Sequence, residues 1–169
     1  MYEALRESAT AGALLVVVGT LAVVTGRTFL FPSLGPSAFL LATRPSAPVS
    51  APRRVAGGHA LGVLAGLVTY HALASGVAVT APPPALTGAS ASLAVSGVVS
   101  VVVTTAGMVA ADLRHAPACA TTLIVSLGLL SSPADALLVV TSVVLLLATH
   151  RALLAVERAP VPAVTDRTN

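Results

Sequence analysis

FPSLGPSAFLLATRPSAPVSAPRRVAGGH, residues 31–59, decides the fold, because it concentrates the prolines, arginines and glycines of an otherwise uniformly hydrophobic chain. Pro32, Gly35 and Pro36 prevent a continuous helix at its start, and an apolar run resumes at 38–42. A helix is therefore expected to begin inside apolar surroundings. Its first N–H groups have no partners within the helix and carry the positive end of the helix dipole. This start predicts a site for an anion or another polar ligand, as in the broken helices of transporters.

The composition is that of a membrane protein. Of 169 residues, 56% are hydrophobic and 9% are charged, and the mean hydropathy is +0.94. A soluble domain needs more charge, so we expect an all-α polytopic membrane protein in contact with a lipid bilayer. Residues 1–158 are predicted to form a single transmembrane domain, followed by a polar, flexible tail at 159–169. The basic residues are all arginines, spread singly or in one pair, which argues against a nucleic-acid partner. The single cysteine, Cys119, excludes an intramolecular disulfide and a cysteine-based zinc site.

Six apolar segments are expected to form a helical bundle. Four are long enough to cross a bilayer, at residues 9–26, 57–80, 89–111 and 134–156. The first has no convincing cleavage site and is interpreted as a retained span, not a signal peptide. Two segments, 28–43 and 116–131, are short and broken by proline, and each either crosses or re-enters. Residues 44–54, with three prolines and three arginines, predict an exposed loop.

The arginine distribution favours six crossings. If both short segments cross, Arg27 lies alone on one side, and the other side holds Arg6, Arg44, Arg53, Arg54, Arg114, Arg151, Arg158 and Arg167. If both re-enter, four arginines lie on one side of the membrane and five on the other. The positive-inside rule therefore predicts six crossings in a cell membrane, with both termini cytoplasmic. Two groups of three segments, each with a broken middle segment, suggest the hypothesis of an inverted repeat.

Two rows of small residues predict close helix contacts. Gly58, Gly62 and Gly66 recur every four residues and place bare backbone on one helical face. Ser92, Ser96, Ser100 and Thr104 form a similar row that continues toward Asp112. The serine row predicts either tight packing by small residues or a polar substrate path.

The candidate binding residues lie mainly at the two broken helix starts. Their hydroxyls and unpaired N–H groups would converge there, contributed by Ser33, Gly35, Ser37 and Ala38 at the first break and by Pro117, Ala118, Cys119, Ala120 and Thr121 at the second. Arg27 precedes the first break and could supply a positive charge, or could extend to the membrane interface instead.

Other polar residues near these breaks have two interpretations each. Arg54, with Arg53, either anchors a cytoplasmic loop or contributes to an anion site. His59 and His115 could gate by protonation, or could simply bond a backbone carbonyl. Asp112 could pair with Arg114 or Arg54, or couple transport to protons.

Three ordered motifs resemble the HPP family of small integral membrane proteins. They are FPSLGPSAFLL, then PRRVAGGH at 52–59, then a His-x-Pro-small-small-Ala-Thr element at 115–121. The family's namesake His-Pro-Pro reads His115-Ala116-Pro117 here, and Cys119 replaces a usual glycine. The family is usually described as having four spans, against the six segments counted here. Its plant and cyanobacterial members are linked to nitrite transport, so the resemblance implies nitrite or a similar small anion as substrate.

Transport of a small inorganic anion through the two broken helices is therefore the first function expected. The alternative is a membrane scaffold or accessory subunit that assembles through the glycine face. No nucleophile elbow, Walker loop or His-x-x-x-His pair is present, so we expect neither an enzyme nor a bound cofactor or metal. Because one chain of this size has little room to shield a polar path, a homo-oligomer is expected.

Overall fold

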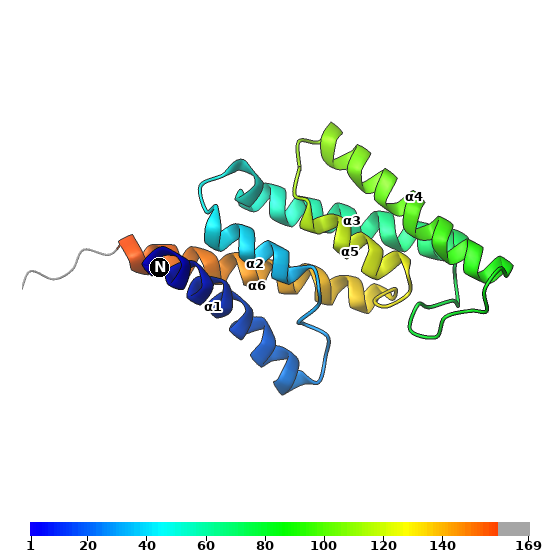
Figure 1. Cartoon of the computed structure of the whole chain (residues 1–169), viewed down its shortest axis with the longest axis horizontal. Helices are drawn as coiled ribbons and strands as arrows, with labels where there is room; N and C mark the ends of the chain where they lie inside the picture. The colour runs from blue at the N-terminus through cyan, green and yellow to red at the C-terminus, as the bar shows by residue number, and fades with distance from the viewer. Residues whose placement is uncertain (159–169) are drawn as a thin grey trace, which may run out of the picture.

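A computed structural model describes residues 1–158, and the predicted flexible tail at 159–169 lies outside them. Within that range the chain is helical and contains no β-strand beyond one isolated bridge between Ala78 and Ala81. The elements are α1 (Tyr2–Thr25), α2 (Leu34–Thr43), the 3₁₀ turn η1 (Pro48–Ser50), α3 (Pro52–Leu73), α4 (Gly88–Ala110), α5 (Pro117–Ser126) and α6 (Pro133–Arg158) (Figure 1). The all-α class is thus confirmed.

Within residues 1–158, three helices, α1, α4 and α6, are long and apolar enough to cross a membrane. The sequence predicts four such spans, and α3 is the exception. It has 22 residues, but two arginines, two histidines and four glycines lower its hydropathy. This lower hydropathy fits its position: α3 packs against α4, α5 and α6, and its glycines and the fully buried His59 face these neighbours.

Successive helices run in alternating directions between two ends of the bundle (Figure 1). At one end the start of α1 lies beside the ends of α2 and α6. The α2–α3 and α4–α5 loops also meet at that end, where His115 Nδ1 lies 2.9 Å from the Val49 carbonyl oxygen. The other end joins the α3–α4 and α5–α6 loops, where Val79 N–H donates to the Leu127 carbonyl (3.0 Å). Six crossings require this alternation; which end is cytoplasmic stays a prediction.

The two broken segments contain short helices with non-helical flanks. The segment predicted at 28–43 becomes helical only at Leu34, and α2 has 10 residues. Such a helix rises only about 15 Å, so residues 26–33 cover the rest of the path without helical structure. α5 also has 10 residues and is followed by irregular structure at 127–132. The predicted breaks are present, but the first one ends earlier than expected: Gly35 and Pro36 lie in the first turn of α2, where a proline needs no N–H partner.

The exposed loop predicted at 44–54 is more ordered than expected. It contains η1, and α3 begins inside it at Pro52. Ser50 is buried and its hydroxyl donates to the Leu40 carbonyl (3.1 Å). Proline at the first position of α3 explains the early start, because a first-turn residue needs no N–H donor.

The glycine face of α3 packs against α5 of the same chain. A Cβ added at Gly62 would lie 2.7 Å from Thr122 Oγ1 and 2.8 Å from the Ala118 carbonyl oxygen. One added at Gly66 would lie 2.7 Å from Val125 Cβ. The close contact predicted from the four-residue spacing is thus present. Since α5 covers this face, it offers no surface to a partner.

The serine row of α4 packs against α5 through hydroxyl groups. Ser96 Oγ donates to the Ser126 carbonyl (3.0 Å), Ser100 Oγ donates to Ser126 Oγ (2.9 Å), and Thr104 and Thr122 share a 2.8 Å hydrogen bond. The large apolar core instead joins residues of the other helices, including Leu14, Leu34, Val55, Val125 and Val143. These contacts support packing as the role of the serine row.

The contacts between the two groups of three helices follow a shared pattern. Within the first group α1 packs on α2, and within the second α4 packs on α5. The third helix of each group crosses to the other: α3 packs on α4 and α5, and α6 packs on α1 and α2. The inverted repeat stays a hypothesis, and this pattern favours it.

Candidate functional site

The first turn of α2 lies against the middle of α5. Ser33 is the N-cap residue of α2, and its Oγ lies 2.6 Å from Thr121 Oγ1. Four residues later, Ser37 lies on the same face of α2 and reaches the segment just before α5. The N-terminal halves of the two short helices therefore lie side by side, with the start of α2 beside the middle of α5 and Ser37 beside the residues that precede α5.

Two histidines connect these hydroxyls into one network. Thr121 Oγ1 lies 2.6 Å from His59 Nδ1, and His59 Nε2 lies 3.0 Å from Ser37 Oγ. Ser37 Oγ also lies 3.1 Å from His115 Nε2. We call Ser33, Ser37, His59, His115 and Thr121 the buried polar cluster. Each of the five has an exposed fraction of 0%.

The glycine face brings α3 close enough for His59 to join the cluster. Gly58 precedes His59, and a Cβ added there would lie 3.2 Å from His115 Cβ. A larger residue would push α3 away from the start of α5. The imidazole rings of His59 and His115 lie with centroids 5.2 Å apart. The small-residue spacing and the polar cluster thus depend on the same helix contact.

Burying this many polar groups is costly unless each has a partner. Inside a membrane protein such groups mark functional sites more often than packing sites. Here hydrogen bonds pair all five members, so the cluster is closed and internally satisfied in this structure. A ligand could enter only by replacing some of these hydrogen bonds.

The other predicted site residues lie outside the cluster. Arg27 is exposed just beyond Gly26, which ends α1. Arg54 pairs with Asp112. Gly35 lies in the first turn of α2, where an added Cβ would meet nothing within 4 Å, so close packing does not require glycine there. Pro117 is buried and begins α5.

The small residues next to the cluster in sequence make no polar side-chain contact with it. Ala38 and Ala118 are buried, whereas Cys119 and Ala120 are half-buried. Cys119 Sγ faces Thr105 Oγ1 of α4 at 3.9 Å. Sequence reasoning missed Val49, whose backbone carbonyl bonds His115, because a carbonyl has no side-chain signal.

An arginine–aspartate group closes the end of the bundle near His115. Arg54 Nη2 donates to both carboxylate oxygens of Asp112 (2.9 and 2.7 Å), and Arg114 Nη1 donates to one of them (2.9 Å). Arg53 Nη2 donates to the Ala111 carbonyl at the end of α4 (3.0 Å). Asp112 therefore pairs with both predicted partners. The arginine pair anchors the start of α3 to the α4–α5 loop.

The hydrogen bond from Arg54 holds the pKa of the Asp112 carboxyl below its usual value, despite opposing desolvation, and the nearby arginine charges add to this effect. A lowered folded-state pKa stabilises the fold above the unfolded pKa, about 3.9, and this contribution is lost as pH falls further.

We expect Asp112→Asn to lower the thermal midpoint of detergent-solubilised protein at pH 7. The difference from the wild type should shrink below about pH 4. Glu3→Gln, in the exposed first turn of α1, is the control, and an equal difference at every pH would contradict this account.

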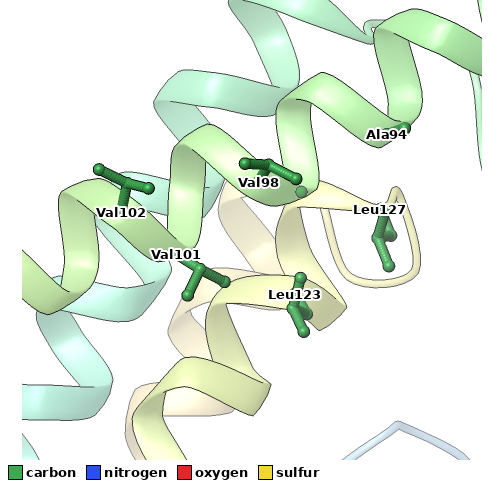
Figure 2. A pocket seen from close by; sticks show the side chains of 7 residues that line it. Ala94, Val98, Val101, Val102, Leu123 and Leu127 are labelled. Carbon is green, nitrogen blue, oxygen red and sulfur yellow. The ribbon is translucent and has the colours of Figure 1, made fainter.

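A surface pocket between α4 and α5 is entirely apolar. Its volume is about 440 Å³. Figure 2 shows the apolar side chains that line it, including Val98, Val101, Leu123 and Leu127. The pocket offers no hydrogen-bond donor from a side chain. It lies apart from the cluster and is unsuited to an anion.

A smaller pocket adjoins the sequence just before Ser33. It has a volume of about 190 Å³ and is lined by Thr28, Phe31, Pro32, Thr80 and four residues of the α5–α6 region. Phe31 lines this pocket and is only 3% exposed. It precedes Ser33, the N-cap residue of α2, by two positions in the chain. The pocket lies at the end of the bundle opposite the Arg54–Asp112 pair.

Metal ligands do not gather in the described part of the chain. Across residues 1–158, no three side chains of histidine, cysteine, aspartate or glutamate come together as a ligand set.

These features define a class of protein: a multi-pass helical membrane protein with two short broken helices that meet in a buried polar cluster. The chain belongs to the HPP family, because the family's model, described as "HPP, transmembrane region", matches residues 1–159. The match confirms the resemblance inferred from the three sequence motifs. Comparisons with curated proteins and with solved structures gave no match.

Proposed function

We propose that this protein transports a small inorganic anion such as nitrite, and that the buried polar cluster is the site through which the anion passes. The observation that carries the proposal is the complete burial of two histidines and three hydroxyls where two broken helices overlap. Stability alone would favour apolar residues at such positions, since pairing only offsets the cost of burial.

The cluster has the chemistry that a small oxyanion needs. Ser33, Ser37 and Thr121 supply hydroxyl donors, and the imidazoles supply N–H donors. The cluster contains no arginine, so a positive charge would come from protonation of His59 or His115. Its members already lie 2.6–3.1 Å apart, which leaves room for an anion only if α2 and α5 separate slightly.

Access from one end would begin at the pocket lined by Thr28 and Phe31. Arg27 immediately precedes Thr28 and is exposed, so it would attract anions to this mouth instead of binding them inside. Phe31 would have to move for an anion to reach Ser33. At the other end, the Arg54–Asp112 ion pair lies on the route past His115.

We propose transport over catalysis because Ser37 is not placed as a nucleophile. Its Oγ lies within hydrogen-bond distance of His59, His115 and the Ser33 carbonyl, and the residue is fully buried, so its hydroxyl is not exposed to a substrate. A nucleophile needs a free lone pair directed at a substrate. Among residues 1–158, no carboxylate is bonded to either imidazole to orient it as a catalytic base.

The scaffold alternative requires the glycine face of α3 to be free for a partner, and this face is covered. Gly58, Gly62 and Gly66 contact α5 within the chain, so assembly through this face would require unpacking α5. A homo-oligomer stays a prediction, and another surface would have to form it.

The direct test is anion uptake into liposomes that contain the purified protein, comparing nitrite with nitrate and chloride. Protein-dependent, saturable nitrite uptake would support the proposal. No uptake of any of the three anions by folded, inserted protein would refute it.

The hydroxyl of Thr121 is the sharpest single probe of the site. Thr121→Val keeps the side-chain shape and removes the group that bonds both Ser33 and His59. We expect nitrite uptake to fall at least about tenfold, which corresponds to losing roughly 1.4 kcal/mol of binding. Thr105→Val, on the exposed side of α4, is the matched control and should transport normally. Equal uptake by both variants would remove Thr121 from the site.

A further inference from the structure

We infer that the buried polar cluster is a one-directional proton relay ending on His115, and that the anion crosses together with a proton. This inference rests on the proposed function and adds the ion that drives it. It follows from which atoms can donate and which can only accept.

The backbone carbonyl of Val49 fixes the first member of the relay. A carbonyl oxygen only accepts, so His115 Nδ1, 2.9 Å away, must carry a hydrogen. In a neutral imidazole the other nitrogen is then an acceptor. The Ser37 hydroxyl, 3.1 Å from His115 Nε2, must therefore donate to it.

The same logic fixes the remaining members. Because the Ser37 proton points at His115, Ser37 Oγ accepts from His59 Nε2–H at 3.0 Å. His59 Nδ1 is then an acceptor and takes the Thr121 hydroxyl proton at 2.6 Å. Thr121 Oγ1 in turn accepts from the Ser33 hydroxyl at 2.6 Å. In this assignment the four side-chain to side-chain hydrogen bonds of the cluster all point from Ser33 toward His115, which is the arrangement that passes a proton from group to group.

The network also accommodates an additional proton without moving a heavy atom. If His115 is protonated, both its nitrogens donate, so Ser37 can no longer give its proton to Nε2. The Ser33 carbonyl lies 3.1 Å from Ser37 Oγ and offers the alternative acceptor. Rotation of one hydroxyl therefore satisfies both protonation states, and Val49, which cannot take a proton, makes His115 the end of the relay.

Few other titratable groups face the two imidazoles. α2, η1 and α4 contain none, and the Cys119 thiol of α5 faces α4. On α6, His150 is buried, and its Nε2 has no hydrogen-bond partner among the described residues. The charged neighbours toward the loop are Arg54, Asp112 and Arg114, which pair with one another. Arg53 also lies there and bonds the Ala111 carbonyl. Within the part of the chain that the structure describes, a proton held on His115 or His59 therefore has no partner carboxylate, and an entering anion would supply the compensating charge.

A balance of two gradients tests the coupling in wild-type protein. The nitrite concentration inside the vesicles is made about tenfold higher than in the medium. The medium is made about one pH unit more acidic than the vesicle interior, and the membrane potential is held at zero. If one proton accompanies each nitrite, the two gradients cancel and net flux stops. Leakage of nitrous acid through lipid also vanishes under this balance, so it does not obscure the result.

Two variants and a control connect the coupling to the relay. His115→Gln keeps a donor and an acceptor but cannot hold a proton, and Ser37→Ala removes the rotating hydroxyl with little change in volume. Each should lower proton-coupled uptake at least about tenfold, and the remaining flux should no longer stop at the balanced gradients. His71→Gln, at the exposed end of α3, should behave as the wild type. Ser37→Ala decides the question if His115→Gln does not fold.

The outcomes separate this inference from the proposed function. Protein-dependent nitrite efflux from wild-type vesicles under balanced gradients would overturn proton coupling and leave nitrite transport standing. Variants that still stop at the same balance would place the proton elsewhere and overturn the relay. Absence of flux under every gradient would refute the proposed function itself.

Discussion

Gly62→Leu is expected to yield no folded protein. The glycine lies on the face of α3 that packs against α5, and even a single added carbon would lie 2.7 Å from Thr122 Oγ1 and 2.8 Å from the Ala118 carbonyl oxygen. Carbonyl backbone cannot move aside as a flexible side chain can, so the helices would have to separate. Overpacking typically costs about 1–3 kcal/mol, and a leucine forced against backbone should reach or exceed the upper end, a large part of the stability of a domain. Size-exclusion chromatography and thermal unfolding in detergent would show aggregated or unfolded material.

The matched control for this substitution is Gly12→Leu on α1. Gly12 is exposed, and an added Cβ there would meet nothing within 4 Å. It should express and elute as the wild type, although both changes place the same side chain in a helix. A folded Gly62→Leu protein that merely lost self-association would instead restore the glycine face as a surface for partners.

The architecture was largely predictable because each element has a local cause. The prolines before α2 and at the start of α5 break two apolar segments, and the arginine distribution favours alternation of six segments. The extent of α3 was less predictable, because its two arginines and Pro52 suggest a loop. Their role depends on contacts with Asp112 and Ala111, residues far along the chain. Such contacts leave no pattern in α3 itself.

The site was predictable residue by residue but not as a network. Polar residues in apolar surroundings drew attention to Ser37, His59 and Thr121 singly. Their convergence depends on how closely the glycine face lets α3 approach α5. Arg54 was a reasonable candidate by nearness in sequence, yet five residues along a helix turn it about 140° away from His59. It therefore faces Asp112 instead of the cluster.

His59→Leu is expected to abolish nitrite transport in a protein that still folds. His59 alone connects Thr121 on α5 with Ser37 on α2, through its two ring nitrogens. Leucine fills a similar volume but leaves both hydroxyls without this partner, at about 1–3 kcal/mol for each group that finds no other. Ser33 and His115 remain as partners, which limits the loss. Thermal unfolding should show a moderately lower midpoint, and liposome uptake should fall to the protein-free level.

His59→Gln separates the structural role of this residue from its role with protons. Glutamine can accept from Thr121 and donate to Ser37, so it should recover most of the thermal midpoint that leucine loses. It cannot pass a proton from one side to the other, since an amide does not protonate in this pH range. If His59→Gln restores stability but not transport, His59 belongs to the relay. If it restores both, the role of His59 is only structural, to hold α2, α3 and α5 together. His71→Leu, on the same helix but exposed, controls for loss of a histidine as such.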